Sequence, residues 1–138
     1  MVLIDAKDAV VGRLGARVAK MLLSGQEVEI MNADKAIMVG SLPAAKQKYF
    51  SRRSQKNKRN PDESPKWPRV PHLLLRRIIR GMLPWKSKRG KEAYRRLKVV
   101  SGELEGKPQK IPESFREKKG GSFTLSDLCL ELGGNKKW

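Results

Sequence analysis

The sequence predicts a single α/β domain, residues 1–138, built on a parallel or mostly parallel sheet. The length of 138 residues suits one domain that buries roughly two thirds of its unfolded surface. Short apolar runs of strand length alternate along the chain with segments that place apolar residues at helical spacing. This alternation is typical of βαβ units, in which the strands run parallel.

The first part of the chain contains three expected strands and two expected helices. The apolar run VLID at 2–5 suits a buried strand, and an amphipathic helix follows over 12–23. We expect further strands at 28–31 and 36–40, separated by the turn-like sequence NADK. Pro43 opens the second helix as its first residue. One face of the first helix is basic: Arg13, Arg17 and Lys20.

The second part alternates in the same way after an interruption. The polar, Pro-rich segment at 51–71 is expected to be extended, and poorly ordered without its partner. A helix at 71–82, a short helix at 90–97 and a strand at 97–102 follow it. The last helix, at 124–132, begins with Thr and Asp at the spacing of a capping box and is followed by two glycines.

Positive charge is concentrated in the middle of the chain. The whole chain has 31 Lys and Arg against 14 Asp and Glu, a formal net charge of +17. Residues 1–45 carry 5 basic and 5 acidic side chains, residues 46–98 carry 19 and 3, and residues 99–138 carry 7 and 6. A surface that serves only solubility mixes both signs. The concentrated charge therefore indicates a polyanionic partner, with a merely solvated basic face as the alternative.

Nucleic acid fits this basic region better than a membrane does. Aromatic residues lie among the cations, which suits phosphate contact combined with stacking on bases or sugars: Tyr49, Phe50, Trp67, Trp85 and Tyr94. Membrane binding would need a long amphipathic helix, which the prolines of 51–71 interrupt. The sequence has no apolar run of 18 residues and no signal-peptide pattern, so we expect a soluble, cytoplasmic protein.

Catalytic and nucleotide-binding alternatives are disfavoured. The G-x-x-G at 12–15 lacks the third glycine of a dinucleotide fingerprint and the G-K-[ST] of a P-loop, so a tight strand-to-helix turn explains it better. It also resembles the loop of KH-type RNA-binding modules, although no helix has room to precede it. Cys129 and His72 are single and lie in apolar helical contexts. We expect no enzyme activity, no metal and no cofactor.

Three stretches, in order, resemble one protein family: IDAKDAVVGRLGARVAKML, IMNADKAIMVG and RRIIRGMLPWKSKRGKEAYRRLKVVSG. They are similar to the large-subunit ribosomal protein family thirteen over about residues 2–106, most specifically from Gly81 to Val99. The insert and the ending GSFTLSDLCLELGGNKKW look like the archaeal and eukaryotic branch. Because the long helical extension of eukaryotic members is missing, we expect an archaeal protein.

This resemblance implies a three-layer α/β/α fold with a four-stranded parallel sheet, a basic Pro-rich insert at about 51–71 and a C-terminal helical extension at about 107–138. It also implies a structural, non-catalytic role in the large ribosomal subunit, where the protein binds large-subunit rRNA, contacts neighbouring ribosomal proteins and takes part in assembly. No membrane and no small-molecule substrate are expected. A free-standing RNA regulator is an alternative, because a surface that binds rRNA can also bind a messenger hairpin.

Fifteen cations are the predicted RNA-contacting residues. In the insert, which is too polar to pack, they are Arg52, Arg53, Lys56, Lys58, Arg59, Lys66 and Arg69. On the later helices and the loop between them, they are Arg76, Arg77, Arg80, Lys86, Lys88, Arg89, Lys91 and Arg95. In that loop we expect Met82 and Leu83 to return to the core and the chain from Trp85 onward to face RNA. For any one cation, simple solvation is the alternative.

Overall fold

A three-stranded parallel sheet forms the centre of the computed structural model, which describes residues 1–115 and 120–135. In sheet order, the strands are β1 (Val2–Asp5), β2 (Val28–Met31) and β4 (Leu97–Val99). Ile4 pairs with Ile30 across the first pair of strands, and Ile30 pairs with Val99 across the second. All three side chains are buried, so this row places one face of the sheet in the core.

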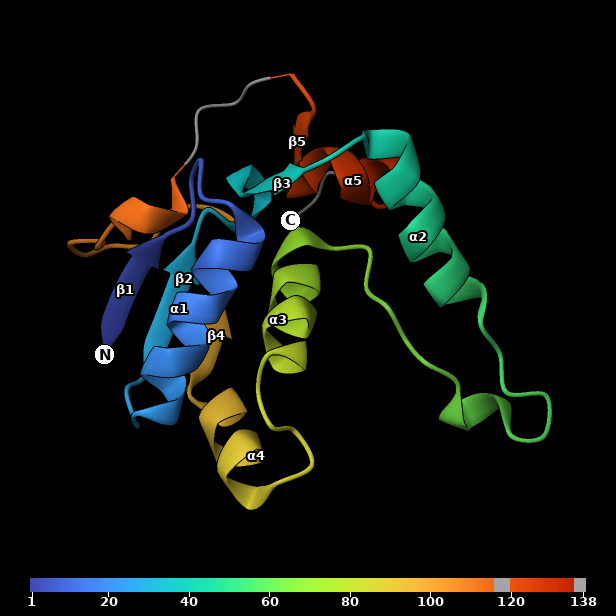
Figure 1. Cartoon of the computed structure of the whole chain (residues 1–138), viewed down its shortest axis with the longest axis horizontal. Coiled ribbons are helices and arrows are strands. Elements are labelled where there is room, and N and C mark those ends of the chain that lie inside the picture. Colours follow the sequence, from blue (N-terminus) through green and yellow to red (C-terminus); the bar gives the residue numbers. More distant parts are fainter. Residues whose placement is uncertain (116–119, 136–138) are drawn as a thin grey trace.

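Two helices cover that face of the sheet. They are α1 (Val11–Leu23), which connects β1 to β2, and α3 (Pro71–Gly81), which lies in the connection from β2 to β4. Both connections step in the same direction across the sheet, so right-handed crossovers put both helices on one face (Figure 1). Their apolar stripes are buried: Leu14, Val18, Leu22, Leu74, Leu75 and Ile79.

The remaining elements complete the path of the chain. After α3, the helix α4 (Lys88–Arg95) leads directly into β4. The described residues also form short 3-10 helices: η1 (Ala33–Lys35), η2 (Pro61–Glu63) and η3 (Pro112–Ser114). In residues 1–115 and 120–135, no helix is long and apolar enough to cross a membrane.

On the opposite face of the sheet, one row of paired residues contains two charged side chains. Leu3 pairs with Glu29, and Glu29 pairs with Lys98. Lys98 is exposed, and its Nζ lies 2.5 Å from Glu29 Oε1. A Cβ on Gly106 would lie 3.0 Å from the Leu3 side chain, so a loop covers that end of the row. The predicted three-layer arrangement is therefore confirmed only for the sheet and one helical layer.

The predicted fourth strand does not join the parallel sheet. β3 (Ile37–Val39) pairs antiparallel with β5 (Ser122–Thr124), which the sequence did not reveal as a strand. The prediction of a four-stranded parallel sheet is therefore wrong. The reason lies just before β3, where Asn32 adopts a left-handed conformation with φ of 55° and η1 turns the chain. Ile37 N then donates to Ala9 O at 2.8 Å, away from the edges of β2.

The predicted C-terminal helix is confirmed as α5 (Leu125–Glu131). Its capping box is complete: Asp127 N donates to Thr124 Oγ1 at 3.2 Å, and Thr124 N donates to Asp127 Oδ2 at 3.1 Å. The apolar side of α5 is buried in the same core as the sheet: Leu125, Leu128 and Cys129. The described part of the predicted extension thus contributes to the core through α5, whereas residues 116–119 and 136–138 of that extension lie outside the described residues.

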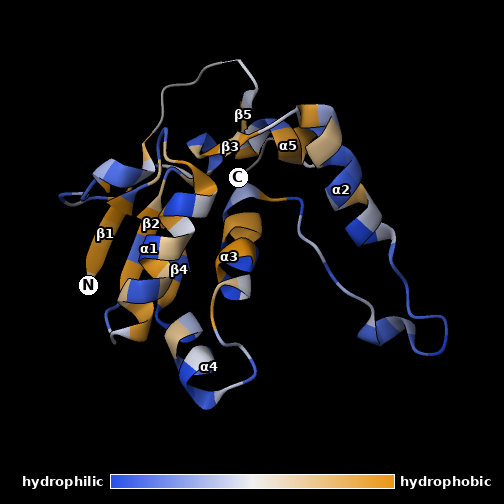
Figure 2. Ribbon diagram, in the orientation of Figure 1, coloured by the Kyte–Doolittle hydropathy of each residue, from blue (hydrophilic) through white to orange (hydrophobic). Residues whose placement is uncertain are grey.

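The basic insert is only partly extended. α2 (Leu42–Ser54) continues into it, and residues 55–66, which we call the arm, then run away from the sheet (Figure 1). Figure 2 shows that the arm is hydrophilic along its length, which agrees with the prediction. Its return is anchored, because Trp67 packs against the core and a Cβ on Gly134 would lie 2.6 Å from Arg69 O. The expectation that the whole insert is too polar to pack is wrong at this end.

Candidate nucleic-acid interface

The structure divides the fifteen predicted cations by exposure. Ten are exposed: Lys56, Lys58, Arg59, Lys66, Arg69, Lys86, Lys88, Arg89, Lys91 and Arg95. Five are half-buried: Arg52, Arg53, Arg76, Arg77 and Arg80. The half-buried arginines lie on α2 and α3, whereas the exposed cations lie on and just after the arm, on α4 and on the loop before it. The two groups therefore differ in how firmly the fold holds them.

None of the fifteen cations takes part in an ion pair among the residues that the structure describes. The ion pairs found there are Arg17–Glu113, Lys35–Glu103, Lys46–Glu131 and Lys98–Glu29. Two of these pairs involve Lys46 and Lys98, cations of the basic region that were not predicted to contact RNA. Among the described residues the predicted set thus has no acidic partner, which favours a polyanionic partner outside the chain.

Two arginines of α3 lie over aromatic rings of α4 and of the loop before it. The guanidinium carbon of Arg76 is 4.7 Å from the Tyr94 ring centroid, and that of Arg80 is 4.3 Å from the Trp85 ring centroid. Trp85 and Tyr94 meet edge to face, with centroids 5.0 Å apart and planes at 86°. We call these four residues the Tyr94 cluster. Stacking of this kind restricts the guanidinium planes and leaves their charge in place.

The loop between α3 and α4 is held by hydrogen bonds between the Ser87 side chain and the backbone around it. Ser87 Oγ donates to Pro84 O at 2.8 Å and accepts from Gly90 N at 3.1 Å, which caps α4. A Cβ on Gly90 would lie 2.0 Å from Pro84 O, so only glycine fits this approach. The capped turn therefore presents Lys86 of the loop and Lys88 and Arg89 of the first turn of α4 from a fixed base.

The predicted roles of the loop's apolar residues are partly confirmed. Leu83 is 6% exposed and lies in the core, as expected. Met82 is 38% exposed, although its Sδ is close to the backbone of Gly15 on α1. Trp85 does not point freely outward, because its ring packs on Tyr94 and under Arg80. In the structure, Trp85 orients a cation.

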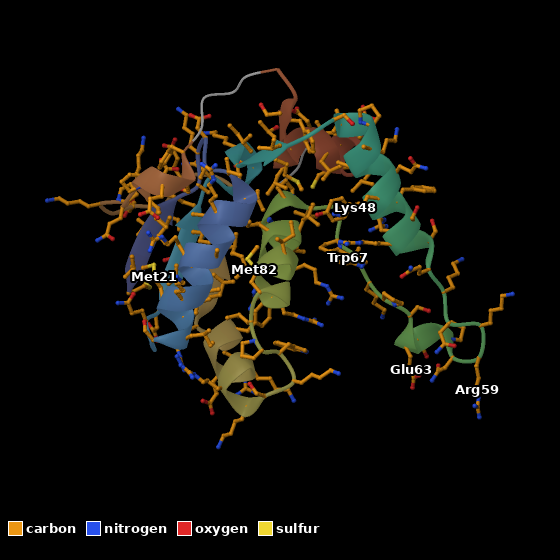
Figure 3. The ribbon with its side chains drawn as sticks, in the orientation of Figure 1. Met21, Lys48, Arg59, Glu63, Trp67 and Met82 are labelled. Carbon is orange, nitrogen blue, oxygen red and sulfur yellow. The ribbon has the colours of Figure 1, made fainter. Side chains whose placement is uncertain are left out.

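A second cluster joins α2, α3 and the end of the insert around Trp67. The Arg52 and Arg77 guanidinium carbons lie 4.8 and 5.1 Å from the Trp67 ring centroid, and the Tyr49 ring meets Trp67 edge to face at 5.7 Å. Arg53 Nη1 donates to Trp67 O. We call these five residues the Trp67 cluster. Figure 3 shows Trp67 between α2 and α3, with Arg59 at the far end of the arm.

Burial and a neighbouring like charge disfavour the protonated state of two of the half-buried arginines, Arg53 and Arg77. Burial, with Arg80 nearby, lowers the pKa of Arg77. Burial, with Arg69 nearby, lowers the pKa of Arg53. Guanidinium groups nevertheless stay charged in proteins. Arg76 in addition buries Nε without a hydrogen-bond partner in the part of the chain that the structure describes. An anion beside these groups would relieve the repulsion and provide the missing acceptor.

Arg89 has a structural contact as well as a predicted RNA contact. Its Nη2 donates to Leu23 O at 3.2 Å, and Arg96 Nη1 donates to Leu22 O at 3.1 Å. These two carbonyls lie at the C-terminal end of α1, where cations are favourable. Sequence reasoning missed Arg96 as an anchor of α4 on α1, since no local pattern links residues so far apart in the chain.

The residues behind the catalytic alternatives have other roles. Gly15 lies where α1 packs on the end of α3, because a Cβ there would lie 2.8 Å from Met82 Sδ and 3.5 Å from the Ile79 side chain. Cys129 is fully buried, and burial raises the pKa of its thiol to about 12. His72 Nδ1 lies 3.2 Å from Ser101 Oγ. A buried thiol that stays protonated is a poor nucleophile.

Comparison with known proteins agrees with the sequence motifs. The pattern of the family Ribosomal protein L13 matches residues 1–105, a range that includes all fifteen predicted cations. The large ribosomal subunit protein uL13 of Methanococcus maripaludis is 49% identical over 107 residues, which cover 77% of this chain and 78% of that protein.

Two further relatives match nearly the whole chain. The uL13 proteins of Methanococcoides burtonii and Methanopyrus kandleri are 45% and 40% identical over 139 residues. These matches cover 96% and 94% of this chain, and 98% and 85% of those proteins. All three organisms are archaea, which agrees with the predicted branch. With the family pattern matched over most of its length, the chain belongs to the ribosomal protein L13 family.

Proposed function

We propose that this chain is a structural, non-catalytic component of the large ribosomal subunit that binds large-subunit rRNA and takes part in subunit assembly. The observation that carries the proposal is the set of fifteen cations that have no acidic partner within the described ranges. Membership of the family, whose archaeal relatives compared above are named as large ribosomal subunit proteins, supports the same conclusion.

RNA is bound in two ways on this proposal. The Tyr94 and Trp67 clusters hold arginines against rings, so little side-chain freedom is lost when they meet phosphates or base edges. Apart from Arg89, which is bonded to Leu23 O, the exposed cations of the arm and of α4 are long side chains that act as mobile charges along the RNA backbone. The first group sets orientation, and the second adds affinity that depends on salt.

The expected salt dependence is steep. If about eight of the fifteen cations meet phosphates, a duplex-like slope of about −0.9 per contact gives a slope of log K against log salt near −7. A solvated basic face would show no such dependence, because it would release no ions from RNA. Neighbouring ribosomal proteins are the other expected contacts of the surface that RNA does not cover.

Co-sedimentation tests the proposal. The tagged protein is expressed in an archaeal host, and ribosomal subunits are separated in a gradient of high salt. We expect the protein to sediment with the large subunit and to stay there when weakly attached factors are removed. Recovery of the protein entirely in the free soluble fraction would overturn the ribosomal assignment and favour a free-standing RNA regulator.

A further inference from the structure

The first third of the chain has no net charge in the sequence, yet one of its surfaces is basic. Three of its five acidic residues turn inward: Asp5 is buried and bonded to Asn32, Glu29 is buried beside Lys98, and Asp34 buries its Oδ1. The basic stripe of α1 stays exposed: Arg13, Arg17 and Lys20. Folding therefore separates charges that the sequence balances.

This stripe borders a groove between α1 and residues 110–113. Two adjoining hollows of about 290 and 470 Å³ share Arg17, Lys20 and Glu113. Four cations line them: Arg13, Arg17, Lys20 and Lys110. Three apolar residues also line the smaller hollow: Met21, Ile111 and Pro112. We call these two hollows together the α1 groove.

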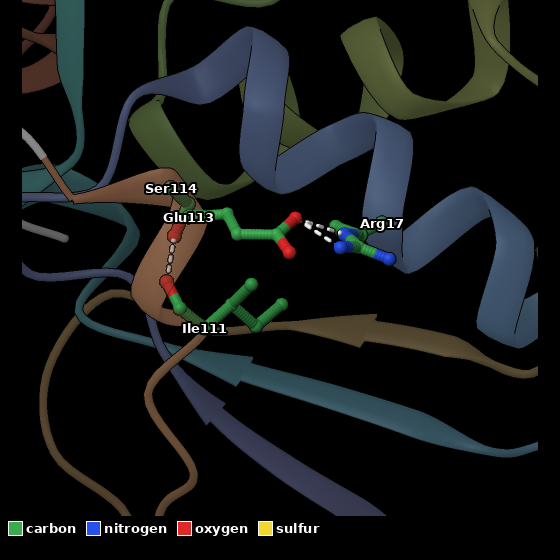
Figure 4. Close-up of polar contacts among 4 residues, drawn as sticks. All are labelled: Arg17, Ile111, Glu113 and Ser114. Atoms are coloured by element: carbon green, nitrogen blue, oxygen red, sulfur yellow. Dashed lines mark hydrogen bonds and ion pairs between the residues drawn. The ribbon is translucent and has the colours of Figure 1, made fainter.

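One acid lines the α1 groove among the described residues, and it holds Arg17. Arg17 Nε donates to Glu113 Oε2 at 2.8 Å, and Nη2 contacts the same oxygen (Figure 4). Both side chains are largely exposed, so the pair contributes little stability. Even with Glu113 counted, the groove has a net charge of about +3, which comes from four cations and one acid.

The α1 groove and the Tyr94 cluster lie on different flanks of α1. Gly15 faces α3, since a Cβ there would meet Met82 and Ile79. Arg17 reaches Glu113 on η3, and positions 15 and 17 are about 200° apart around a helix. A single strand lying on α3 and α4 would therefore have to pass around α1 to reach the groove.

We propose that the α1 groove binds the backbone of a second RNA strand, separate from the RNA that faces α3 and α4. The inference rests on the proposed function for the identity of the polyanion. Arg13 and Lys20 are about 10 Å apart along the helix axis, so the cations can follow a strand over more than one phosphate. The protein then joins two RNA segments, as a component that stabilises an assembled subunit would.

The composition of the groove favours RNA over an acidic peptide. A nucleotide brings one flat ring that can rest against the apolar lining of Met21, Ile111 and Pro112, and a phosphate that can meet the cations of the same lining. A peptide would instead bring a polar backbone N–H and C=O at every residue, which the apolar part of the lining cannot satisfy.

A tethered cleavage probe tests the proposal in assembled subunits. Ala16 lies in the α1 groove, Glu92 lies on α4, and both side chains are exposed. Each is replaced by cysteine in a separate variant, Ala16→Cys and Glu92→Cys. A hydroxyl-radical source is attached to each new thiol, while the buried Cys129 stays unlabelled. We expect both variants to cut the rRNA, at segments distant from each other in its sequence and secondary structure.

The outcomes separate this inference from the proposed function. Two outcomes would overturn the proposed second RNA strand and leave the ribosomal role intact. In one, the probe at position 92 cuts rRNA and the probe at position 16 does not. In the other, both probes cut the same rRNA segment. Cleavage of a protein backbone from Ala16→Cys overturns the second strand in favour of a protein partner. If neither variant enters a subunit or cuts rRNA, the proposed function fails as well.

Charge variants with opposite expected signs provide a second test with purified large-subunit rRNA. The double variant Arg13→Glu, Lys20→Glu should make the slope of log K against log salt shallower by about 1.4, at about 0.7 per lost single-strand contact. Glu113→Gln removes the acid of the groove and should tighten binding about twofold or more. Weaker binding by Glu113→Gln, or an unchanged slope in the double variant with an unchanged melting temperature, overturns the proposal.

Discussion

The guanidinium carbon of Arg80 lies 4.3 Å from the ring centroid of Trp85, so the last turn of α3 is stacked on the loop that follows it. Trp85 is held in turn by Tyr94 on α4, edge to face at 5.0 Å. The tryptophan of the loop thus positions a cation. This arrangement explains why apolar and basic residues adjoin in the sequence GMLPWKSKRG at 81–90.

Trp85→Leu should weaken rRNA binding without changing its salt dependence. The substitution removes the ring under Arg80, and a stacked guanidinium of this kind is worth about 1 kcal/mol. We therefore expect a Kd about fivefold higher. Filter binding at several salt concentrations measures both quantities. Lys86→Ala is the matched control. It should make the slope of log K against log salt shallower by about 1, because it removes an exposed cation. A slope change in Trp85→Leu equal to that of Lys86→Ala would contradict the positioning role.

Gly90→Ala should destabilise the protein far more than Gly15→Ala. A Cβ on Gly90 would lie 2.0 Å from Pro84 O and 2.4 Å from Pro84 C, both in the backbone of the capped turn. We expect a loss of about 3 kcal/mol in the free energy of unfolding. A Cβ on Gly15 meets the flexible end of Met82, which can move, and alanine is the better helix former. The loss there should be about 1 kcal/mol or less.

Urea denaturation of the two glycine variants distinguishes these effects. The midpoint of Gly90→Ala should fall clearly, whereas that of Gly15→Ala should stay close to the parent. Equal midpoints would show that the turn before α4 can open without cost, and that the loop does not present its cations from a rigid base.

Local features of the fold could be predicted from the sequence, and long-range pairing could not. The stripe of α1 and the capping box of Thr124 and Asp127 depend on spacings of three and four residues, and both are confirmed. The pairing of Met38 with Phe123 joins distant segments, and a three-residue strand carries no periodicity that predicts it. The sheet was therefore assigned a fourth parallel strand that it does not have.

The same distinction holds for the candidate site. Concentration of charge predicts the cations of α3 and α4 as RNA contacts, because it needs no knowledge of contacts within the fold. Arg52 follows Tyr49 by three residues, a spacing at which helical side chains meet. The Arg52 guanidinium carbon lies 5.5 Å from the Tyr49 ring centroid. The contact of Arg76 with Tyr94 has no such local signal. Counts of charge along the sequence could not predict the net positive charge of the α1 groove, because they do not show which acidic residues are buried.

Cys129 should react with a thiol reagent only when the whole protein unfolds. Its side chain is fully buried in the core, and its pKa of about 12 keeps the thiol protonated near neutral pH. We propose that α5 and the parallel sheet form one cooperative unit. The rate of labelling by an aromatic disulfide should therefore rise at the same urea concentration as the loss of tryptophan fluorescence. Labelling at a clearly lower concentration would show that α5 detaches first.

His72 should make the protein less stable as the pH falls below about 6.5. Burial lowers the pKa of His72 from its ordinary value of 6.5. Between the two values the unfolded chain binds more protons than the folded one, so the free energy of unfolding decreases with falling pH in that window and is restored above 6.5. His72 is the single histidine of the chain, which makes the comparison clean. His72→Asn cannot titrate there, so the urea midpoint of the parent relative to this variant should be higher at pH 7.5 than at pH 5. If the difference between the two urea midpoints did not change with pH, the pKa of His72 would be the same in the folded protein and in the unfolded chain.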